Sequence, residues 1–300
     1  MPELGSQDGS FEQLFRGSAR LGLMCGALGV PYEHGAAFVA KFPAELDDYM
    51  ELSVDDSSNA LGLMTRGQGQ DFTHRVVHFM ESRGVPEERL RRLLVTARHF
   101  EHRNLFVKLE LDQDGPAEIS WYFRRRPSLN DAKAWLLQGG AGARDLRLVD
   151  QVGQALGKST VHFLAQSEPL NGKGFPASKL YFSQPSADAS WPRLRAAAEL
   201  CGADWEATLE PHHSWLAGRT AFLSFAFGPG LRVPGCKVDV HELEVMALRK
   251  LLEANGRWEA SRERMRTLLE LGGKEHLDYV GLRLSPGKPV GVKLYSSLGG

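Results

Sequence analysis

A helix–strand–strand–helix pattern recurs along this chain of 300 residues, roughly every 50 to 60 residues, and such a period restricts the fold more than any other feature. Short apolar runs with alternating polarity occur in pairs separated by polar or Gly/Pro-containing loops. The expected strand pairs are 36–43 with 48–54, 105–112 with 119–127, 160–167 with 177–185, 206–216 with 219–227, and 277–285 with 290–298. Ten antiparallel strands rarely remain an open twisted sheet, because its edges are left unprotected. We therefore predict an α+β fold: a closed ten-stranded antiparallel β-barrel of five α-β-β-α units, with helices outside and a solvent-filled lumen.

Helical periodicity separates the predicted strand pairs and supplies the outer layer. The expected helices are 11–29, 71–84, 85–100, 128–140 (with Ser128 as N-cap), 145–156, 191–203, 241–254 and 257–271. Residues 1–10 are expected to be a disordered N-terminus, and residues 11–300 to form a single barrel domain.

Charge and cysteine content exclude several classes of protein. The formal net charge is −1, so no overall positive field favours nucleic acid or an anionic membrane. The three cysteines, Cys25, Cys201 and Cys236, are far apart and form no CxxC motif, and no apolar run is long enough to span a bilayer. We expect a cytoplasmic monomer that binds neither nucleic acid nor membrane.

Two K-x-Y strands indicate what faces the lumen. In SKLYF, Lys179 and Tyr181 alternate with Leu180, and VKLYS repeats the pattern with Lys293 and Tyr295. The apolar set must pack on the helices, so the lysines and tyrosines are predicted to point inward. The same parity predicts further lumen side chains, which are Glu51, Ser53, Asp55, Lys108, Glu110, Tyr122, Arg124 and Arg283.

Several cations in one chamber repel one another unless an anion lies among them. Phosphate or diphosphate fits best, since lysine donates to it as a point charge and tyrosine adds a neutral hydrogen bond. Tyrosine faces also stabilise cations. Such a chamber suits chemistry in which an allylic diphosphate ionises.

The five repeated units, the SKLYF and VKLYS strands and the closing YVGLRLSPGKPVGVKLYSSL together resemble the soluble aromatic prenyltransferases of the ABBA, or prenyltransferase-barrel, family. The resemblance runs from about residue 11 to 298. It implies transfer of a dimethylallyl or geranyl group from its diphosphate to an electron-rich aromatic acceptor in the lumen. The implied partners are a prenyl diphosphate and a small aromatic molecule or peptide.

The resemblance also implies residue roles. Glu51 matches the acidic position that acts as base. The diphosphate is expected to bind Lys108, Lys179, Lys293, Arg124 and Arg283, the cation to be shielded by Tyr122, Tyr181 and Tyr295, and the acceptor pocket to include Ser53, His213 and Trp215. No cofactor is required and no metal ligands are predicted, although Mg²⁺ dependence stays open.

Some features depart from this pattern or compete with it. The fourth unit lacks a K-x-Y strand, and Lys237 in GCKVDV is predicted to lie in a loop. DDYME at 47–51 resembles a magnesium-binding DDxxD box, but on a strand its carboxylates alternate between faces. Glu51 could instead be a structural ion-pair partner. Prenylation of a Tyr- or Trp-containing peptide, and a non-catalytic barrel that binds an anionic amphiphile, remain alternatives.

Overall fold

The computed structural model describes residues 19–55, 59–170, 175–184, 190–228 and 235–297. The expected N-terminal disorder at 1–10 lies outside these ranges. The ten strands are β1 (Glu51–Asp55), β2 (Leu61–Gly67), β3 (Leu105–Asp112), β4 (Gly115–Phe123), β5 (Phe163–Pro169), β6 (Ala177–Ser183), β7 (Thr220–Phe227), β8 (Gly235–His241), β9 (Tyr279–Leu284) and β10 (Gly291–Ser297). Each pairs antiparallel with its neighbours, and β1 pairs with β10, so the predicted ten-stranded barrel is confirmed.

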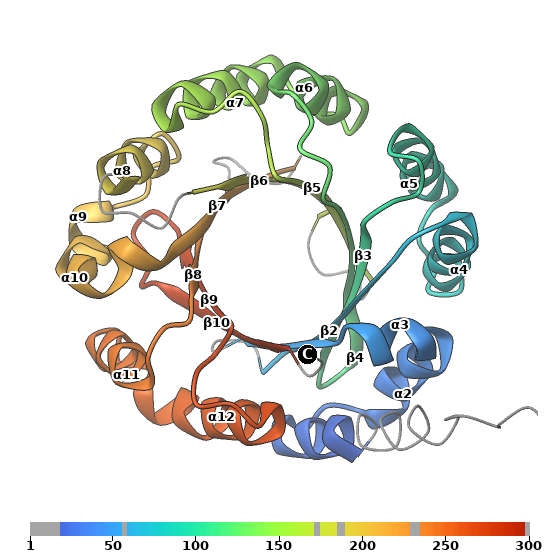
Figure 1. Cartoon of the computed structure of the whole chain (residues 1–300), viewed down its shortest axis with the longest axis horizontal. Coiled ribbons are helices and arrows are strands. Elements are labelled where there is room, and N and C mark those ends of the chain that lie inside the picture. The colour runs from blue at the N-terminus through green and yellow to red at the C-terminus, as the bar shows by residue number, and fades with distance from the viewer. Residues whose placement is uncertain (1–18, 56–58, 171–174, 185–189, 229–234, 298–300) are drawn as a thin grey trace, which may run out of the picture.

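Helices surround this barrel on its outside (Figure 1). Residues 19–28 are helical. The helices that follow are α2 (Tyr32–Lys41), α3 (Pro43–Asp48), α4 (Gln70–Glu81), α5 (Glu87–His99), α6 (Leu129–Gln138), α7 (Ala143–Leu156), α8 (Trp191–Glu199), α9 (Trp205–Thr208), α10 (His213–Leu216), α11 (Val245–Ala254) and α12 (Trp258–Gly272), with short 3₁₀ turns at Glu210–His212 and Ala217–Arg219. Ser128 caps α6 as expected, accepting a hydrogen bond from the Asp131 amide. Among the described residues, no helix is long and apolar enough to cross a membrane.

Alternation along the strands separates two environments. On β6, Leu180 and Phe182 are at most 1% exposed and belong to the apolar layer between barrel and helices, whereas Lys179 and Tyr181 face the lumen. Burying each large apolar side chain contributes about 1.5–3 kcal/mol, so the outer layer fixes the strand register.

The first and fourth hairpins differ from the sequence prediction. Residues 36–43, expected as a strand, belong mainly to α2, because Phe38 and Phe42 stand one helical turn apart and pack together against Phe79. The first hairpin is instead β1 with β2.

The segment 206–216, also expected as a strand, is helical. The Asp204 side chain accepts a hydrogen bond from the Ala207 amide and caps α9, and Pro211 begins the next turn. The partner of β7 is β8, whose outward residues Cys236, Val238 and Val240 are buried. Lys237 therefore lies on a strand, and the predicted loop is wrong.

Candidate active site

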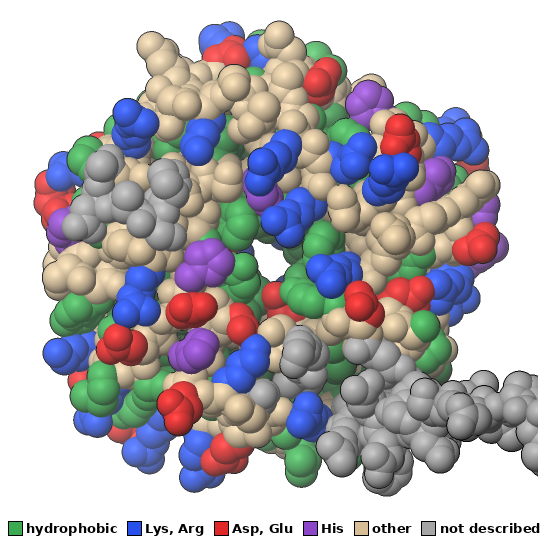
Figure 2. Space-filling model, viewed as in Figure 1, with side chains coloured by type: hydrophobic (Ala, Val, Ile, Leu, Met, Phe, Trp, Pro, Cys, Tyr) green, Lys and Arg blue, Asp and Glu red, His purple; other side chains and the backbone are tan. Residues whose placement is uncertain are grey.

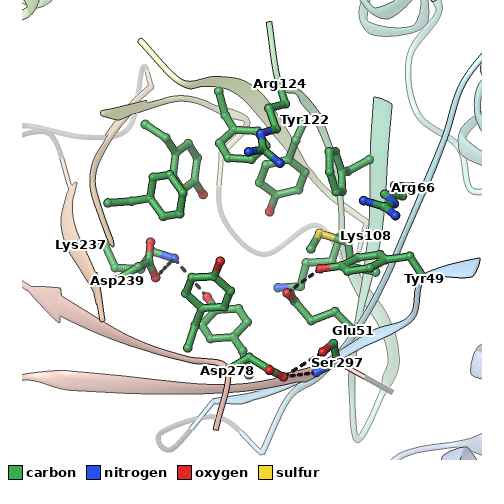
Figure 3. Close-up of a pocket in the computed structure, with 17 residues that line it drawn as sticks. Tyr49, Glu51, Arg66, Lys108, Tyr122, Arg124, Lys237, Asp239, Asp278 and Ser297 are labelled. Carbon is green, nitrogen blue, oxygen red and sulfur yellow. Dashed lines mark hydrogen bonds and ion pairs between the residues drawn. The ribbon is translucent and has the colours of Figure 1, made fainter. Parts of the chain in front are cut away.

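A cavity of about 410 Å³ occupies the barrel lumen and opens at one end. Its lining comes from the start of odd-numbered strands and the end of even-numbered ones, so it lies opposite the hairpin turns. Five tyrosines, three phenylalanines, four basic and three acidic residues line it, with Met64 and Ser297 (Figure 3). This size and mixture are typical of a small-molecule site.

Glu51, on β1, is the most chemically distinctive group of this cavity. Its carboxylate is 6% exposed and accepts a 2.9 Å hydrogen bond from the Tyr49 hydroxyl. Burial raises the pKa of Glu51 to about 7, although the Tyr49 hydrogen bond and the nearby charges of Lys108 and Lys237 lower it. A carboxyl that is half ionised near neutral pH suits proton transfer.

Tyr49 is itself held in place. Thr65 donates a 2.8 Å hydrogen bond to the backbone carbonyl of Tyr49, and the tyrosine ring meets Phe106 edge to face with centroids 6.0 Å apart. Burial and Glu51 both raise the pKa of Tyr49. Tyr49 therefore stays a protonated donor that orients the Glu51 carboxylate.

Lys237 lies across the cavity from Glu51 (Figure 3). Its ammonium donates to Asp239 at 2.8 Å and to the Tyr295 hydroxyl at 3.1 Å, and it stands 5.6 and 5.2 Å from the ring centroids of Tyr181 and Tyr295. Burial alone would lower the pKa of Lys237, but Asp239 raises it well above the usual value. The lysine is therefore a fixed positive charge.

Tyr122, Tyr181 and Tyr295, predicted to shield a cation, all line the cavity. The rings of Tyr122 and Tyr181 are 6.0 Å apart. Burial raises the pKa of Tyr181, and it raises that of Tyr295 to about 12. Tyr181 and Tyr295 therefore remain neutral, and all three tyrosines present aromatic faces to the same space.

A second aromatic group was missed by sequence reasoning. Phe106, Phe163 and Phe222 line the cavity, with Phe163 at 5.8 Å from each of the other two. The alternation along the strands could have identified two of these lumen residues, because Phe106 shares a face with Lys108 and Phe163 pairs with Tyr181. This side of the cavity offers apolar ring faces.

The predicted cations lie in two layers. Lys108 and Arg124 line the cavity together with Arg66, which also contacts Asp48 at 3.5 Å. Lys179, Lys293 and Arg283 are not among the lining residues.

Each of these three cations has a carboxylate partner. Lys179 lies 3.6 Å from Glu118 and Arg283 lies 2.6 Å from Asp55, while Lys293 and Lys108 share one oxygen of Glu110. Burial lowers the pKa of Lys293 to about 8, against the opposing effect of Glu110. Strand parity predicted these cations, and also Glu110 and Asp55, to face the lumen, but it missed Glu118 and could not show which groups pair.

Close packing also separates Ser53 from the cavity. It is 1% exposed, and a Cβ on the facing Gly62 would come within 2.5 Å of both the Ser53 hydroxyl and the Lys108 side chain. Glycine at 62 is therefore what lets these two side chains pack together. Ser53 does not line the cavity.

His213 and Trp215 lie outside the barrel on α10, so their expected place in the acceptor pocket is corrected. His213 packs against Trp191 at 5.0 Å, and Trp215 stacks on His212 at 5.4 Å. The physical reason is the helical conformation of 206–216 described above.

The acidic residues of the DDYME segment lie in different environments. Asp48 ends α3, with its side chain 68% exposed, whereas Glu51 faces the lumen, so the DDYME segment does not gather these two carboxylates. Among the described ranges, no group of three or more His, Cys, Asp or Glu residues is placed to hold a metal ion.

Comparison with known proteins supports the fold. No protein-family model matches the sequence, and no curated protein matches it. Solved structures with the same architecture include a 6-dimethylallyl tryptophan synthase (TM-score 0.67, 17% identity, 94% of each chain covered). Another is the prenyltransferase PriB in a ternary complex with L-tryptophan and dimethylallyl thiolodiphosphate (TM-score 0.62, 17% identity, 95% of this chain and 96% of that one). A third is the 5-dimethylallyl tryptophan synthase of Streptomyces coelicolor with DMASPP and Trp (TM-score 0.61, 15% identity, 95% of each chain).

Proposed function

We propose that this chain, which has the fold of the prenyltransferase-barrel enzymes, transfers a prenyl group from its diphosphate to an electron-rich aromatic ring. The observation that carries the proposal is that one cavity in the lumen holds both the cationic Lys237 between tyrosine faces and the buried Glu51, whose pKa lies at about 7. The first arrangement suits ionisation of an allylic diphosphate, and the second suits removal of the ring proton from the cationic intermediate that forms when the acceptor is alkylated.

In this proposal the diphosphate binds at Lys108, Lys237 and Arg124. All three line the cavity, and the Tyr295 hydroxyl beside Lys237 supplies a neutral donor. Preorganised cations stabilise the charge that develops on a leaving diphosphate, and such stabilisation is commonly the largest contribution to catalysis.

The allyl cation forms when the C1–O bond of the donor breaks and the diphosphate leaves with the electron pair. Tyr122, Tyr181 and Tyr295 would flank it with negative quadrupole density, each contact contributing roughly 0.5–2 kcal/mol. The buried lining also limits capture of the cation by water.

An aromatic acceptor would lie between the phenylalanine side of the cavity and Glu51. A ring carbon forms the new C–C bond with the cation, and the hydrogen on that carbon then leaves as a proton. Glu51, oriented by Tyr49, accepts this proton, and the ring regains its aromaticity. General base catalysis of this kind contributes roughly 10²- to 10⁴-fold.

Lys179, Lys293 and Arg283 take a different part in this proposal. None of the three lines the cavity, and each is paired with Glu118, Glu110 or Asp55. We assign them to the charge balance beneath the cavity. Ser53, which meets Lys108 over Gly62, supports the same layer.

Dimethylallyl diphosphate is the first donor to test, with geranyl diphosphate second, and tryptophan is the first acceptor because the compared synthases act on it. The experiment incubates purified protein with each donor and a panel of indoles, phenols and Trp- or Tyr-containing peptides, with product detection by mass spectrometry. The expected result is an adduct one prenyl group heavier than the acceptor.

Two variants make this experiment specific. Glu51→Gln and Lys237→Gln should each abolish most turnover. The control Lys133→Ala, which removes an ion pair between α6 and Asp150 on α7 outside the barrel, should not. Saturable binding of the donor with no product from any acceptor would contradict transfer and favour a binding barrel for anionic amphiphiles. Products from peptides alone would identify a peptide as acceptor.

A further inference from the structure

A second cleft adjoins the active-site cavity at the barrel mouth. It encloses about 260 Å³ and is lined by Asn104, Arg124, Arg125 and Arg126. Arg124 also lines the lumen cavity, so the two spaces share one side chain. Figure 2 shows Lys and Arg side chains gathered beside the central opening of this face.

Backbone geometry explains how three consecutive arginines come to line one cleft. In a strand, successive side chains point to opposite faces, but β4 ends at Phe123, just before them. The Arg124 amide donates a 3.3 Å hydrogen bond to the Asn104 carbonyl. Asn104 and Arg126 both have left-handed backbone conformations, with φ of 51° and 49°. For Arg126 this conformation is uncommon and unfavourable, so it turns the chain at some energetic cost.

The charges in this cleft lack the compensation seen elsewhere around the lumen. Among the described residues, Arg125 and Arg126 make no hydrogen bond or ion pair, whereas Lys108, Lys179, Lys237, Lys293 and Arg283 each contact a carboxylate. Three adjacent guanidinium groups repel one another in the absence of a ligand. An oxyanion bound among them would relieve that repulsion and accept bidentate hydrogen bonds.

A neutral hydrogen-bond acceptor, and not a carboxylate, orients the Arg124 guanidinium. Its Nε donates a 3.0 Å hydrogen bond to Nε2 of His162, which is 5% exposed. Burial, with the charges of Arg124 and Arg126, lowers the pKa of His162 to about 4, so the imidazole stays neutral and can accept. The two terminal nitrogens of Arg124 are left for a ligand, and its guanidinium carbon stands 6.0 Å from the centroid of Phe163 in the lumen.

We infer that this cleft binds an acidic group of the acceptor, a carboxylate tethered to the aromatic ring that occupies the lumen beside Phe163. The inference rests on the proposed function and narrows it to acidic aromatic acceptors. The ring lies within reach of Glu51, and the carboxylate stays at the mouth with Arg125 and Arg126. The donor's diphosphate remains deeper, with Lys108 and Lys237, and Arg124, which lines both spaces, lies between the two anions.

The test compares acceptors that differ only in the acid. Indole-3-propionate and its alcohol, 3-(indol-3-yl)propanol, are titrated calorimetrically into wild-type protein and into the double variant Arg125→Gln/Arg126→Gln. The wild type should bind the acid at least about 10-fold more tightly than the alcohol, and the double variant should lose about 10- to 100-fold in affinity for the acid. The affinity for the alcohol should change less than about 2-fold. Arg91→Gln, which removes an exposed pair with Glu87 on α5, is the control and should behave as wild type.

Steady-state kinetics then separate this inference from the proposed function. If product forms, KM for the acid should be higher in the double variant than in the wild type, and KM for dimethylallyl diphosphate should be the same in both. A higher KM for the donor in the double variant would show that the cleft binds the diphosphate and would overturn the inference. Equal affinity of the wild type for the acid and the alcohol would also overturn it, but would leave the proposed prenyl transfer intact. Conversely, selective binding of the acid without any product would support the cleft and contradict the proposed function. Thermal melting of each variant checks that it is folded.

Discussion

Substituting Tyr49 by Phe tests the proposed base through one hydrogen bond. The Tyr49 hydroxyl donates to Glu51 at 2.9 Å and lowers the pKa of that carboxyl, which burial has raised to about 7. Phenylalanine keeps the ring that packs on Phe106 and removes only the donor. The ionised form of Glu51 is then less stable, so its pKa must rise further.

The magnitude follows from the energy of a hydrogen bond to a charged group. Such a bond contributes about 1.5–3 kcal/mol, and one pKa unit corresponds to about 1.4 kcal/mol. The pKa of Glu51 should therefore rise by about one to two units in the Tyr49→Phe variant. At pH 7 the ionised fraction falls from about one half to between roughly one tenth and one hundredth, so turnover should fall about 5- to 50-fold and recover near pH 9 to 10.

The assay is the pH dependence of kcat/KM for prenyl transfer. For the wild type, activity should rise with pH through about 7, because the base acts when deprotonated. Tyr49→Phe should move this rising limb of the pH profile to higher pH. The control Tyr279→Phe alters another lining tyrosine, one without a hydrogen bond to Glu51 among the described residues, and should move the limb little. An identical limb in wild type and Tyr49→Phe would refute the assignment of the base.

Further predictions concern the same cavity and its support. Glu51→Gln should remove the limb near pH 7 and lower kcat by roughly 10²- to 10⁴-fold, measured with saturating donor. Lys237→Met leaves Asp239 buried without its partner and should destabilise the fold by about 3–5 kcal/mol in urea unfolding, whereas Lys237→Met/Asp239→Leu should recover much of this stability but not activity. Leu180→Ala, at a position 0% exposed between barrel and helices, should cost about 2–5 kcal/mol by the same measurement without shifting the pH profile. Turnover should persist in excess EDTA, because lysine and arginine side chains supply the positive charge; complete loss that Mg²⁺ restores would contradict this.

Much of the fold was predictable from periodicity, because the outward face of each strand must be apolar to meet a helix. Leu180 and Phe182 show the rule, and it placed Lys179 and Tyr181 correctly toward the lumen. The two failures have local causes. Phe38 and Phe42 form one face of a helix although their segment is rich in residues that also favour strands, and the Asp204 cap turns 206–216 into helix.

The site was predictable in part, for a related reason. Parity shows which way a side chain points but not how far along the barrel it lies or what it meets across the lumen. The pairing of Lys293 with Glu110, and of Lys179 with Glu118, depends on strands far apart in sequence. Lys237 could have been found, since Cys236, Val238 and Val240 alternate with it, but that run is short and follows a Gly/Pro-rich stretch.

The most direct test of the account is a crystal structure with dimethylallyl thiolodiphosphate, an analogue of the donor that ionises slowly. Diphosphate density should lie in the lumen and contact Lys108 and Lys237, with the allyl chain among Tyr122, Tyr181 and Tyr295. Diphosphate bound outside the barrel, or bound only in the arginine cleft with the allyl chain away from those tyrosines, would contradict it.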